Sequence, residues 1–371
     1  MTTAPTMSLV YPPPVLREVG GGARQGMQDE YELFSSRVRW GTHARLTTWL
    51  QERVGEAQGR GTDVFAVADA VQQLALRGGK RMRPVLLVAA YEGCAGEGSL
   101  DAILPACVSL ELLQAYLLIH DDWMDGDEMR RGGPRVPAMM RSRFAGSHAD
   151  SASILAGDLA AAWAHQALLD VDLPPAYVLM AARELAQVEE DVVEGQVLDV
   201  CGMAAEWDDV ERVHALKTAS YSARGPVVMG ARLAAATDAQ VAGLTAFAVP
   251  LGIAFQLRDD VLGTFGDVSA MGKPLGGDLR AGKRTSLVVE AMRDTAARRL
   301  LDRVLGHEDA DENEVRAAVE RIHACGARAR VEQRIETLVR ESRAALASVS
   351  LTPAGRGWLE CAVVALTERQ A

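Results

Sequence analysis

The 371-residue sequence is poor in aromatic residues, in cysteine and in net positive charge. Aromatic residues make up 5% of the chain, and the five cysteines are scattered without any C-x-x-C spacing. An odd, scattered set of thiols predicts neither a disulfide framework nor a zinc site. The formal net charge of −11 argues against a general role in binding nucleic acid. We therefore expect a reduced, cytoplasmic protein that binds no nucleic acid.

The sequence also lacks a secretory signal and a long uninterrupted apolar run. Its N-terminus has no basic start followed by an apolar core. The apolar stretch from Leu244 to Phe255 is short for a bilayer span and contains Pro250. We therefore predict no stable membrane insertion.

Alanine and leucine recur throughout the chain, which favours helices because both residues lose little side-chain entropy there. Residues 1–27 carry three consecutive prolines and three consecutive glycines, so we predict a flexible N-terminal extension, and Met27 could be the true start. Periodic apolar patterns then predict helices over 63–76, 84–91, 100–124, 151–169, 176–198, 206–229, 239–261, 287–305, 312–346 and 353–367. No linker divides residues 28–371, which predicts one large all-α domain built as a helical bundle.

The helix predicted over 100–124 ends in three carboxylates, Asp121, Asp122 and Asp125. Asp121 and Asp125 are four residues apart and share one helical face. Carboxylates so close repel one another unless cations neutralise them, and hard oxygen ligands with open positions suit Mg²⁺. A solvated acidic helix end is the alternative interpretation. A phosphohydrolase doublet of His120 and Asp121 is another, but it needs further histidines, and only His43 lies upstream. Trp123 and Met124, between the carboxylates, are expected to be core residues.

A second apolar helical run ends in the pair Asp259 and Asp260. Two such pairs on separate helices, facing each other across a bundle, could hold a cluster of ions around one diphosphate. The recurrence of the pattern is more specific than either pair alone.

Basic residues accompany both pairs. Lys80, Arg81 and Arg83 follow two glycines at a predicted helix start, where exposed amides favour an anion. Each cation alone is well explained as a solvated surface group, but together they indicate a diphosphate site. The other basic residues in this set are Arg130-Arg131, Lys217 beside Thr218, Lys273 and Lys283.

The ordered set of these motifs resembles the trans-isoprenyl diphosphate synthases, the polyprenyl synthetase family, over about residues 60–290. The matching elements are Gly78-Gly79-Lys80-x-x-Arg83-Pro84, Leu113-Gln114, Asp121-Asp122-x-x-Asp125 with Arg130-Arg131-Gly132, Lys217-Thr218, Phe255-Gln256-x-x-Asp259-Asp260, Gly272-Lys273 and Lys283. The resemblance implies a helical bundle around a central apolar cavity, a homodimer, and a Mg²⁺-dependent prenyl transfer between isopentenyl diphosphate and an allylic prenyl diphosphate, with three ions when substrate is bound.

The resemblance also implies a role for each motif residue. Metal ligands would be Asp121, Asp122, Asp125, Asp259 and Asp260, and the groups implied to be catalytic are Asp121, Asp122, Asp125, Lys217 and Asp259. The allylic diphosphate would be bound by Lys217, Thr218, Gln256, Lys273 and Arg130, and Lys283 would also contact substrate. Isopentenyl diphosphate would be bound by Lys80, Arg83 and Arg131, with Gln114 lining the site. The sequence departs from the family at Gly263, where a third aspartate is usual, and Asp267 is a possible substitute.

Two residues one helical turn before Asp121 are expected to set product length. Tyr116 and Leu117 would point along the growing tail, and in the family an aromatic followed by a smaller aliphatic residue accompanies geranylgeranyl products. The product is therefore predicted to be geranylgeranyl diphosphate, with farnesyl or longer products as alternatives. A class I terpene cyclase and a non-catalytic subunit of a heteromeric synthase are the alternative functions, although the intact first motif argues against the latter.

Overall fold

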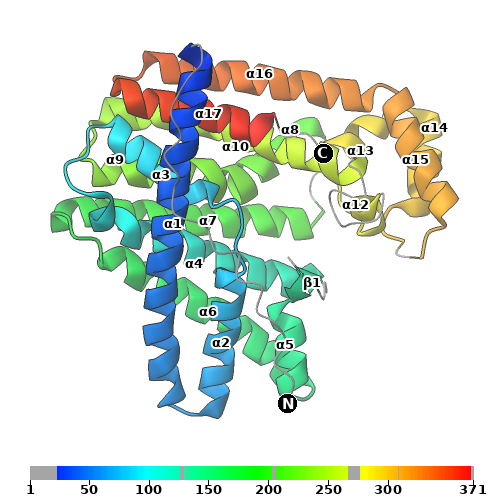
Figure 1. Cartoon of the computed structure of the whole chain (residues 1–371). Helices are drawn as coiled ribbons and strands as arrows, with labels where there is room; N and C mark the ends of the chain where they lie inside the picture. Colours follow the sequence, from blue (N-terminus) through cyan, green and yellow to red (C-terminus); the bar gives the residue numbers. More distant parts are fainter. Residues whose placement is uncertain are drawn as a thin grey trace. The chain divides into compact units, whose positions relative to one another are not determined.

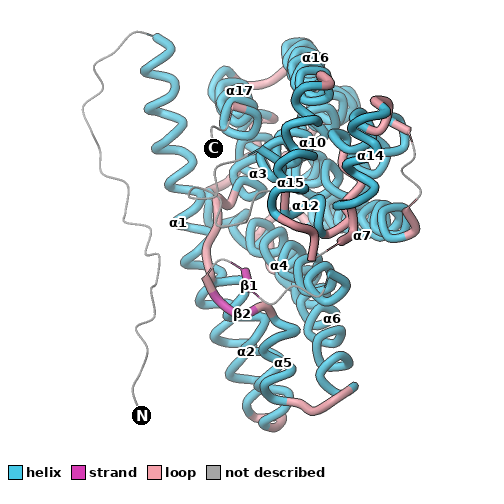
Figure 2. Tube along the Cα trace, turned by 90° about the vertical axis from the view of Figure 1, so that its right-hand side faces the viewer, coloured by secondary structure: helices cyan, strands magenta, loops and turns pink. Residues whose placement is uncertain are grey.

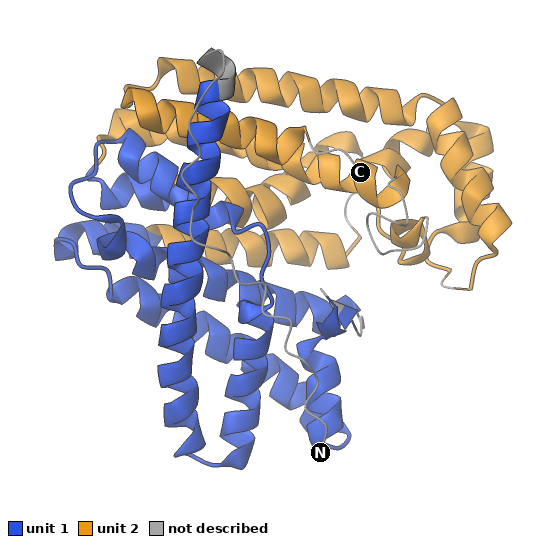
Figure 3. Ribbon diagram, in the orientation of Figure 1, with its two compact units in different colours: residues 1–183, 229–235 blue, residues 184–228, 236–371 orange. Residues whose placement is uncertain are grey.

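The computed structural model describes residues 23–125, 129–130, 132–202, 206–265, 276–307 and 309–368, without the side chains of 23–25 and 130. Figures 1 and 2 show that the described chain consists of helices joined by loops, with one two-stranded hairpin. The all-α fold class is therefore confirmed. The contacts within the chain divide it into two compact units, residues 1–183 with 229–235 and residues 184–228 with 236–371 (Figure 3). The single domain predicted over 28–371 stays a prediction.

Unit 1 is built around α4, which packs against α6, α3 and α1. Its buried side chains include long apolar runs on α3 and α4, as expected of helices covered on most sides. The elements of this unit are α1 (Ala23–Gln58), α2 (Thr62–Leu76), α3 (Met82–Gly93), α4 (Leu100–Asp125), β1 (Met129–Arg130), β2 (Gly133–Pro134), α5 (Val136–Arg143), α6 (Ser147–Leu169) and the first part of α7 (Pro175–Val200).

Unit 2 is built around α10, which packs against α16, α17 and a π-helix, η1. Its apolar core takes side chains from α10, α13, α15 and α16. Its elements are the rest of α7, α8 (Trp207–Val213), η1 (His214–Arg224), α10 (Asp238–Phe265), α12 (Gly277–Arg280), α13 (Ser286–Ala291), α14 (Thr295–Val304), α15 (Glu312–Ala324), α16 (Ala327–Ser348) and α17 (Pro353–Thr367). α9 (Gly225–Leu233) is shared between the two units.

Most predicted helices are present, but two are divided. The helix predicted over 287–305 breaks into α13 and α14, because the Asp294 side chain accepts a hydrogen bond from the Ala297 amide and caps α14. The helix predicted over 312–346 breaks at Gly326, whose φ of 81° is left-handed. The helix predicted over 206–229 is continuous, but its middle part, η1, is a π-helix between α8 and α9. α1 begins at Ala23, so residues 23–27 of the predicted flexible extension are helical, while residues 1–22 lie outside the described chain.

α4 and α10 are each long and apolar enough to cross a membrane. α10 continues to Phe265, past the apolar stretch that ends at Phe255. The most apolar windows of the two helices are 72% and 50% buried within the protein. Their apolarity is accounted for by their central places in the two cores, because core helices are apolar on most sides.

Candidate functional site

The first aspartate motif occupies the last turn and a half of α4, in unit 1. Asp121 is half-buried and Asp125 is exposed, so both carboxylates remain accessible on the face that they share. Asp122 differs from them, because it is fully buried and forms an ion pair with the buried guanidinium of Arg135. The two accessible carboxylates are thus Asp121 and Asp125. The prediction that Asp122 is a third metal ligand stays a prediction.

Two arginines join this motif to the hairpin that follows it. Arg135 donates from Nε to the carbonyl of Met129, 3.0 Å away, and Arg77 donates to the carbonyl of Pro134. Burial lowers the pKa of Arg77, while the negative charge of Asp122 opposes that shift. These bonds fix the hairpin that carries Arg130. The side chain of Arg130, like the whole of Arg131, lies outside the described residues.

The side chains between the carboxylates are not core residues. Trp123 is 39% exposed and Met124 is 43% exposed, so the expectation of core positions was wrong. Trp123 donates from Nε1 to Asp150 at 3.2 Å. His120 is half-buried, and its Nε2 lies 3.0 Å from the carbonyl oxygen of Ile154. A Cβ at Gly157 would collide with the His120 ring, which explains the glycine there.

The turn before α3 separates the three cations that the sequence groups together. Arg81 has a left-handed backbone with φ of 45°, and its side chain is buried in an ion pair with Glu111. Its Nη2 also donates to the Ala75 carbonyl at 2.8 Å. Arg81 is therefore held inside unit 1, whereas Lys80 is exposed and Arg83 is half-buried. Lys80 and Arg83 remain the candidates for binding an anion at this turn.

The predicted residues along α4 lie in the same unit. Gln114 is half-buried and lines a small cavity of about 10 Å³ beside Arg81 and Glu111. Tyr116 and Leu117 are also half-buried, and the Tyr116 ring packs edge-on against His120 with centroids 5.0 Å apart. The aromatic predicted to limit product length is therefore held by a contact one turn further along its own helix.

The second aspartate motif lies near the end of α10, in unit 2, and its second member is buried. Asp260 is 5% exposed and accepts a hydrogen bond at Oδ1 from Gln256 Nε2, 2.8 Å away. Gln256 in turn accepts at Oε1 from the Thr218 hydroxyl at 3.0 Å. On the other side, the Nε2 atom of the buried His214 lies 3.5 Å from Asp260 Oδ2. The structure thus brings together three predicted residues, Thr218, Gln256 and Asp260, and adds His214. Asp259, beside them on α10, is half-buried.

Burial dominates the electrostatics of this group. It raises the pKa of Asp260 to about 7, which the hydrogen bond from Gln256 opposes and the charge of Asp278 reinforces. It lowers the pKa of His214 to about 4, against the neighbouring negative charges of Asp199 and Glu211. Both shifts have the same cause, because burial disfavours the charged form of each side chain.

The π-helix η1 presents Lys217 and Thr218. π-helical turns are rare, and they frequently occur at functional sites. Lys217 Nζ lies 2.6 Å from Asp199 Oδ2 on α7. A Cβ at Gly195 would lie 2.5 Å from the Lys217 amide nitrogen, and one at Gly252 would lie 2.5 Å from Ala219 Cα. Two glycines on α7 and α10 thus allow η1 to approach both helices closely.

The chain after α10 returns to the second motif at α12, which packs against α10. A Cβ placed at Gly263 would overlap Oδ2 of Asp278, so Asp278 approaches α10 one turn after Asp259. Lys283 is exposed, and its positive charge opposes the rise in the pKa of Asp260. The predicted Lys273 and the possible substitute Asp267 lie outside the described residues.

The donors of the two motifs fit Mg²⁺. Within the described parts of the chain, no three His, Cys, Asp or Glu side chains are close enough to hold a metal ion by themselves. Mg²⁺ does not require such a trio, because it usually takes one or two carboxylates and completes its octahedron with water and substrate phosphates. Asp121 with Asp125 is an accessible oxygen pair of this kind. The Oδ2 atom of Asp260 accepts no hydrogen bond within the described residues, although His214 Nε2 lies 3.5 Å from it.

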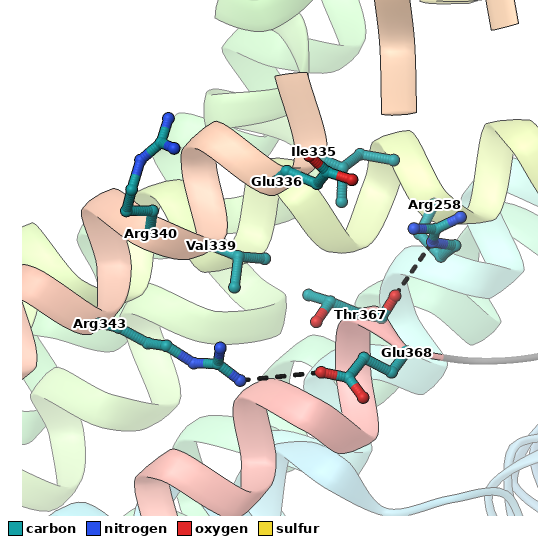
Figure 4. A pocket seen from close by; sticks show the side chains of 8 residues that line it. All are labelled: Arg258, Ile335, Glu336, Val339, Arg340, Arg343, Thr367 and Glu368. Atoms are coloured by element: carbon teal, nitrogen blue, oxygen red, sulfur yellow. Dashed lines mark hydrogen bonds and ion pairs between the residues drawn. The ribbon is translucent and has the colours of Figure 1, made fainter. Parts of the chain in front are cut away.

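A separate pocket of about 380 Å³ lies between α10, α16 and the end of α17 (Figure 4). Arg258 donates from Nε to the Thr367 carbonyl at 3.0 Å on one side, and Arg343 pairs with Glu368 at 3.7 Å on the other. None of the predicted site residues lines it.

Several residues of the site were missed from the sequence. Arg135, Asp199, His214 and Asp278 each contact or lie beside a predicted residue that is more than ten residues away in the chain. His214 lies three residues before Lys217, and this helical spacing was a usable signal. The others had none, since isolated charged residues occur throughout the sequence.

The fold and these residues define a class: an all-α protein with acidic helix ends suited to Mg²⁺ and basic groups suited to diphosphates. The polyprenyl synthetase family model matches residues 65–322. A short chain isoprenyl diphosphate synthase of Methanocaldococcus jannaschii is 33% identical over 261 residues, covering 68% of this chain and 75% of the relative. A (2E,6E)-farnesyl diphosphate synthase of Mycobacterium tuberculosis is 34% identical over 258 residues, covering 67% and 68%.

Solved structures agree with these relatives. A geranylgeranyl pyrophosphate synthase of Corynebacterium glutamicum, in complex with isoprenyl diphosphate and magnesium, has a TM-score of 0.83 and 32% identity, covering 91% of this chain and 99% of that one. The chain belongs to the polyprenyl synthetase family. It is an isoprenyl diphosphate synthase, a prenyltransferase that makes trans-prenyl diphosphates by condensation with isopentenyl diphosphate.

Proposed function

We propose that this synthase elongates a short allylic diphosphate to geranylgeranyl diphosphate. The observation that carries the proposal is Tyr116, a large aromatic one turn before the first motif whose ring is held edge-on against His120. A ring held in this way resists displacement by a growing chain, whereas Leu117 beside it leaves more room. Similarity to the Corynebacterium geranylgeranyl pyrophosphate synthase supports the same product. Relatives that make farnesyl diphosphate are similarly close, so product length needs a direct test.

The two acidic motifs would hold Mg²⁺, as in the magnesium complex of the Corynebacterium enzyme. Asp121 and Asp125 would serve at the end of α4, and Asp259 would serve on α10. We expect three ions when substrate is bound. Mg²⁺ bound at these carboxylates would supply Lewis-acid stabilisation of the charge that develops on a leaving diphosphate.

The chain's own residues would orient the diphosphates. Lys217 and Thr218 are presented together by η1, and Gln256 links Thr218 to Asp260, so these donors are held in fixed positions before substrate arrives. Preorganised donors of this kind stabilise developing charge without reorganising during the reaction. Lys80 and Arg83 would bind isopentenyl diphosphate, and the buried pair of Arg81 and Glu111 would fix the turn that carries them. The apolar side chains along α4 would exclude water from the allylic cation.

We also propose that the enzyme acts as a homodimer in the cytoplasm. The cytoplasmic location is supported by its scattered cysteines, none of which forms a disulfide among the described residues. The dimer is supported by family membership and is tested by sedimentation of the purified chain.

The product is tested by supplying isopentenyl diphosphate with each short allylic diphosphate and separating the dephosphorylated products by chromatography. The wild-type enzyme should stop at the C20 alcohol. Tyr116→Ala should extend the product by one or more C5 units, because the ring no longer limits the tail. Tyr116→Phe is the matched control and should keep the C20 product, since it retains the ring. A Tyr116→Ala variant with wild-type products would show that Tyr116 does not set length.

A further inference from the structure

Four side chains of unit 2 form a ring between η1 and α10. The Thr218 hydroxyl donates to Gln256 Oε1 at 3.0 Å, and Gln256 Nε2 donates to Asp260 Oδ1 at 2.8 Å. The last member is His214, whose Nε2 lies 3.5 Å from the other carboxyl oxygen of Asp260, Oδ2. His214 and Thr218 are four residues apart on η1. Gln256 and Asp260 are likewise four residues apart on α10, so the ring spans about one turn of each helix.

The burial of His214 is not explained by packing alone. Its side chain is 9% exposed, and its Nδ1 atom makes no hydrogen bond within the described residues. A ring nitrogen buried without a partner costs free energy that an apolar side chain of similar size would not cost. The distance of 3.5 Å from Nε2 to Asp260 is long for a hydrogen bond. His214 therefore contributes little direct stability, and what distinguishes it is its place beside Asp260.

The elements around His214 hold it in this place. In the last turn of α8, Glu211 accepts two hydrogen bonds from Arg334 of α16, at 2.7 and 2.8 Å, and these join α8 to α16. Further along η1, a Cβ at Gly252 of α10 would lie 2.5 Å from Ala219 Cα, so the two backbones are close. His214 is the first residue of η1, at the point where α8 ends. The helix that carries it is thus anchored before and after it.

The ring bears on where η1 presents its donors. Lys217 lies between His214 and Thr218 in the chain, and its Nζ is 2.6 Å from Asp199 Oδ2. Because η1 is π-helical, a shift of its register against α10 would move Lys217 and Thr218 together. Contacts at both oxygens of Asp260 oppose such a shift.

We propose that His214 is a positioning residue of the allylic diphosphate site. It packs against the carboxyl oxygen of Asp260 that Gln256 does not contact, and so keeps η1 in register with α10. In this role it touches no substrate and acts through the placement of Lys217 and Thr218. The inference rests on the proposed function, because that function assigns Lys217 and Thr218 to the allylic diphosphate.

Steady-state kinetics of the purified full-length enzyme tests this role, with each substrate varied while the other is saturating. His214→Leu removes the polar ring but keeps a side chain of similar size, and it should raise the KM for the allylic diphosphate about 10-fold. The KM for isopentenyl diphosphate should change by less than about 2-fold, because Lys80 and Arg83 belong to unit 1. His214→Gln keeps an amide nitrogen near the place of Nε2 and should return the allylic KM to within about 3-fold of the wild type.

A matched control and the choice of readout separate positioning from folding. His307→Leu replaces an exposed histidine of the same unit and should leave both KM values unchanged. A variant that folds poorly contains less active enzyme, which lowers the apparent kcat and leaves both KM values as they were.

Wild-type kinetics in His214→Leu, a loss of kcat alone, or an equal rise in both KM values would overturn the inference. So would a His214→Gln variant no better than His214→Leu. Failure of the proposed function would instead be seen in the wild type, as no elongation or as a product other than the C20 chain.

Discussion

The buried pair of Arg81 and Glu111 offers the sharpest prediction about stability. Their side chains are 2% and 3% exposed, so both charges are shielded from water. Glu111→Gln removes the charge of one partner and leaves the guanidinium buried without a counter-charge. Breaking a buried ion pair in this way costs about 3–5 kcal/mol, and we expect the lower end because glutamine retains an oxygen acceptor. With a denaturant dependence of about 3 kcal/mol per M urea, the unfolding midpoint should fall by about 1 M.

Urea unfolding followed by circular dichroism measures this change. The control is Glu92→Gln, which breaks a pair with Arg37 whose side chains are 34% and 55% exposed. That pair should contribute about 1 kcal/mol or less, because solvent screens both charges. The KM for isopentenyl diphosphate should also rise in Glu111→Gln and not in Glu92→Gln, since Arg81 holds the turn that carries Lys80 and Arg83. Equal midpoints for the two variants would refute the reasoning.

Two further predictions concern unit 2. The pKa of Asp260 is raised from its usual 3.8 to about 7, so the folded protein binds this proton more tightly than the unfolded chain. The stabilisation from the protonated carboxyl is fully present below pH 3.8 and is lost as pH rises through about 7. Without metal, Asp260→Asn should therefore be more stable than the wild type at pH 8, by at most about 4 kcal/mol. The difference in the free energy of unfolding should vanish near pH 4. Parallel pH profiles of stability for the two proteins would contradict this. Gly195→Ala places a Cβ against the Lys217 backbone and should destabilise by about 1–3 kcal/mol and raise the KM for the allylic substrate. Gly55→Ala is the control, because its new Cβ meets no atom within 4 Å, and it should be neutral or stabilising. A similar loss of stability in Gly195→Ala and Gly55→Ala would contradict the role assigned to close packing.

The sequence was most informative where one pattern covers a whole element. The predicted helix 353–367 matches α17 to the residue, and 63–76 matches α2 to within one residue. The two divided C-terminal helices could have been anticipated, because Asp294 and Gly326 are standard signals of a helix start and a helix break. The π-helix could not, since its i→i+5 register leaves no distinct mark in composition.

The acidic motifs were recognisable because their members are adjacent in the chain. Their partners were not, because a folded site joins residues that are far apart in sequence. The buried ion pair of Asp122 involves Arg135, and the environment of Asp260 includes His214 and Asp278, all of which are distant in the chain. Burial also changes what a charge does: Arg81 belongs to the same turn as Lys80, but only the structure shows that it faces inward to Glu111.

The most direct test of the central claim is incorporation of labelled isopentenyl diphosphate by the purified chain in the presence of Mg²⁺ and geranyl or farnesyl diphosphate. The wild type should transfer label into a longer prenyl diphosphate, the reaction should stop when EDTA removes the metal, and Asp121→Ala should lower the rate at least about 100-fold. No incorporation with any allylic starter, or undiminished incorporation by Asp121→Ala, would contradict the account.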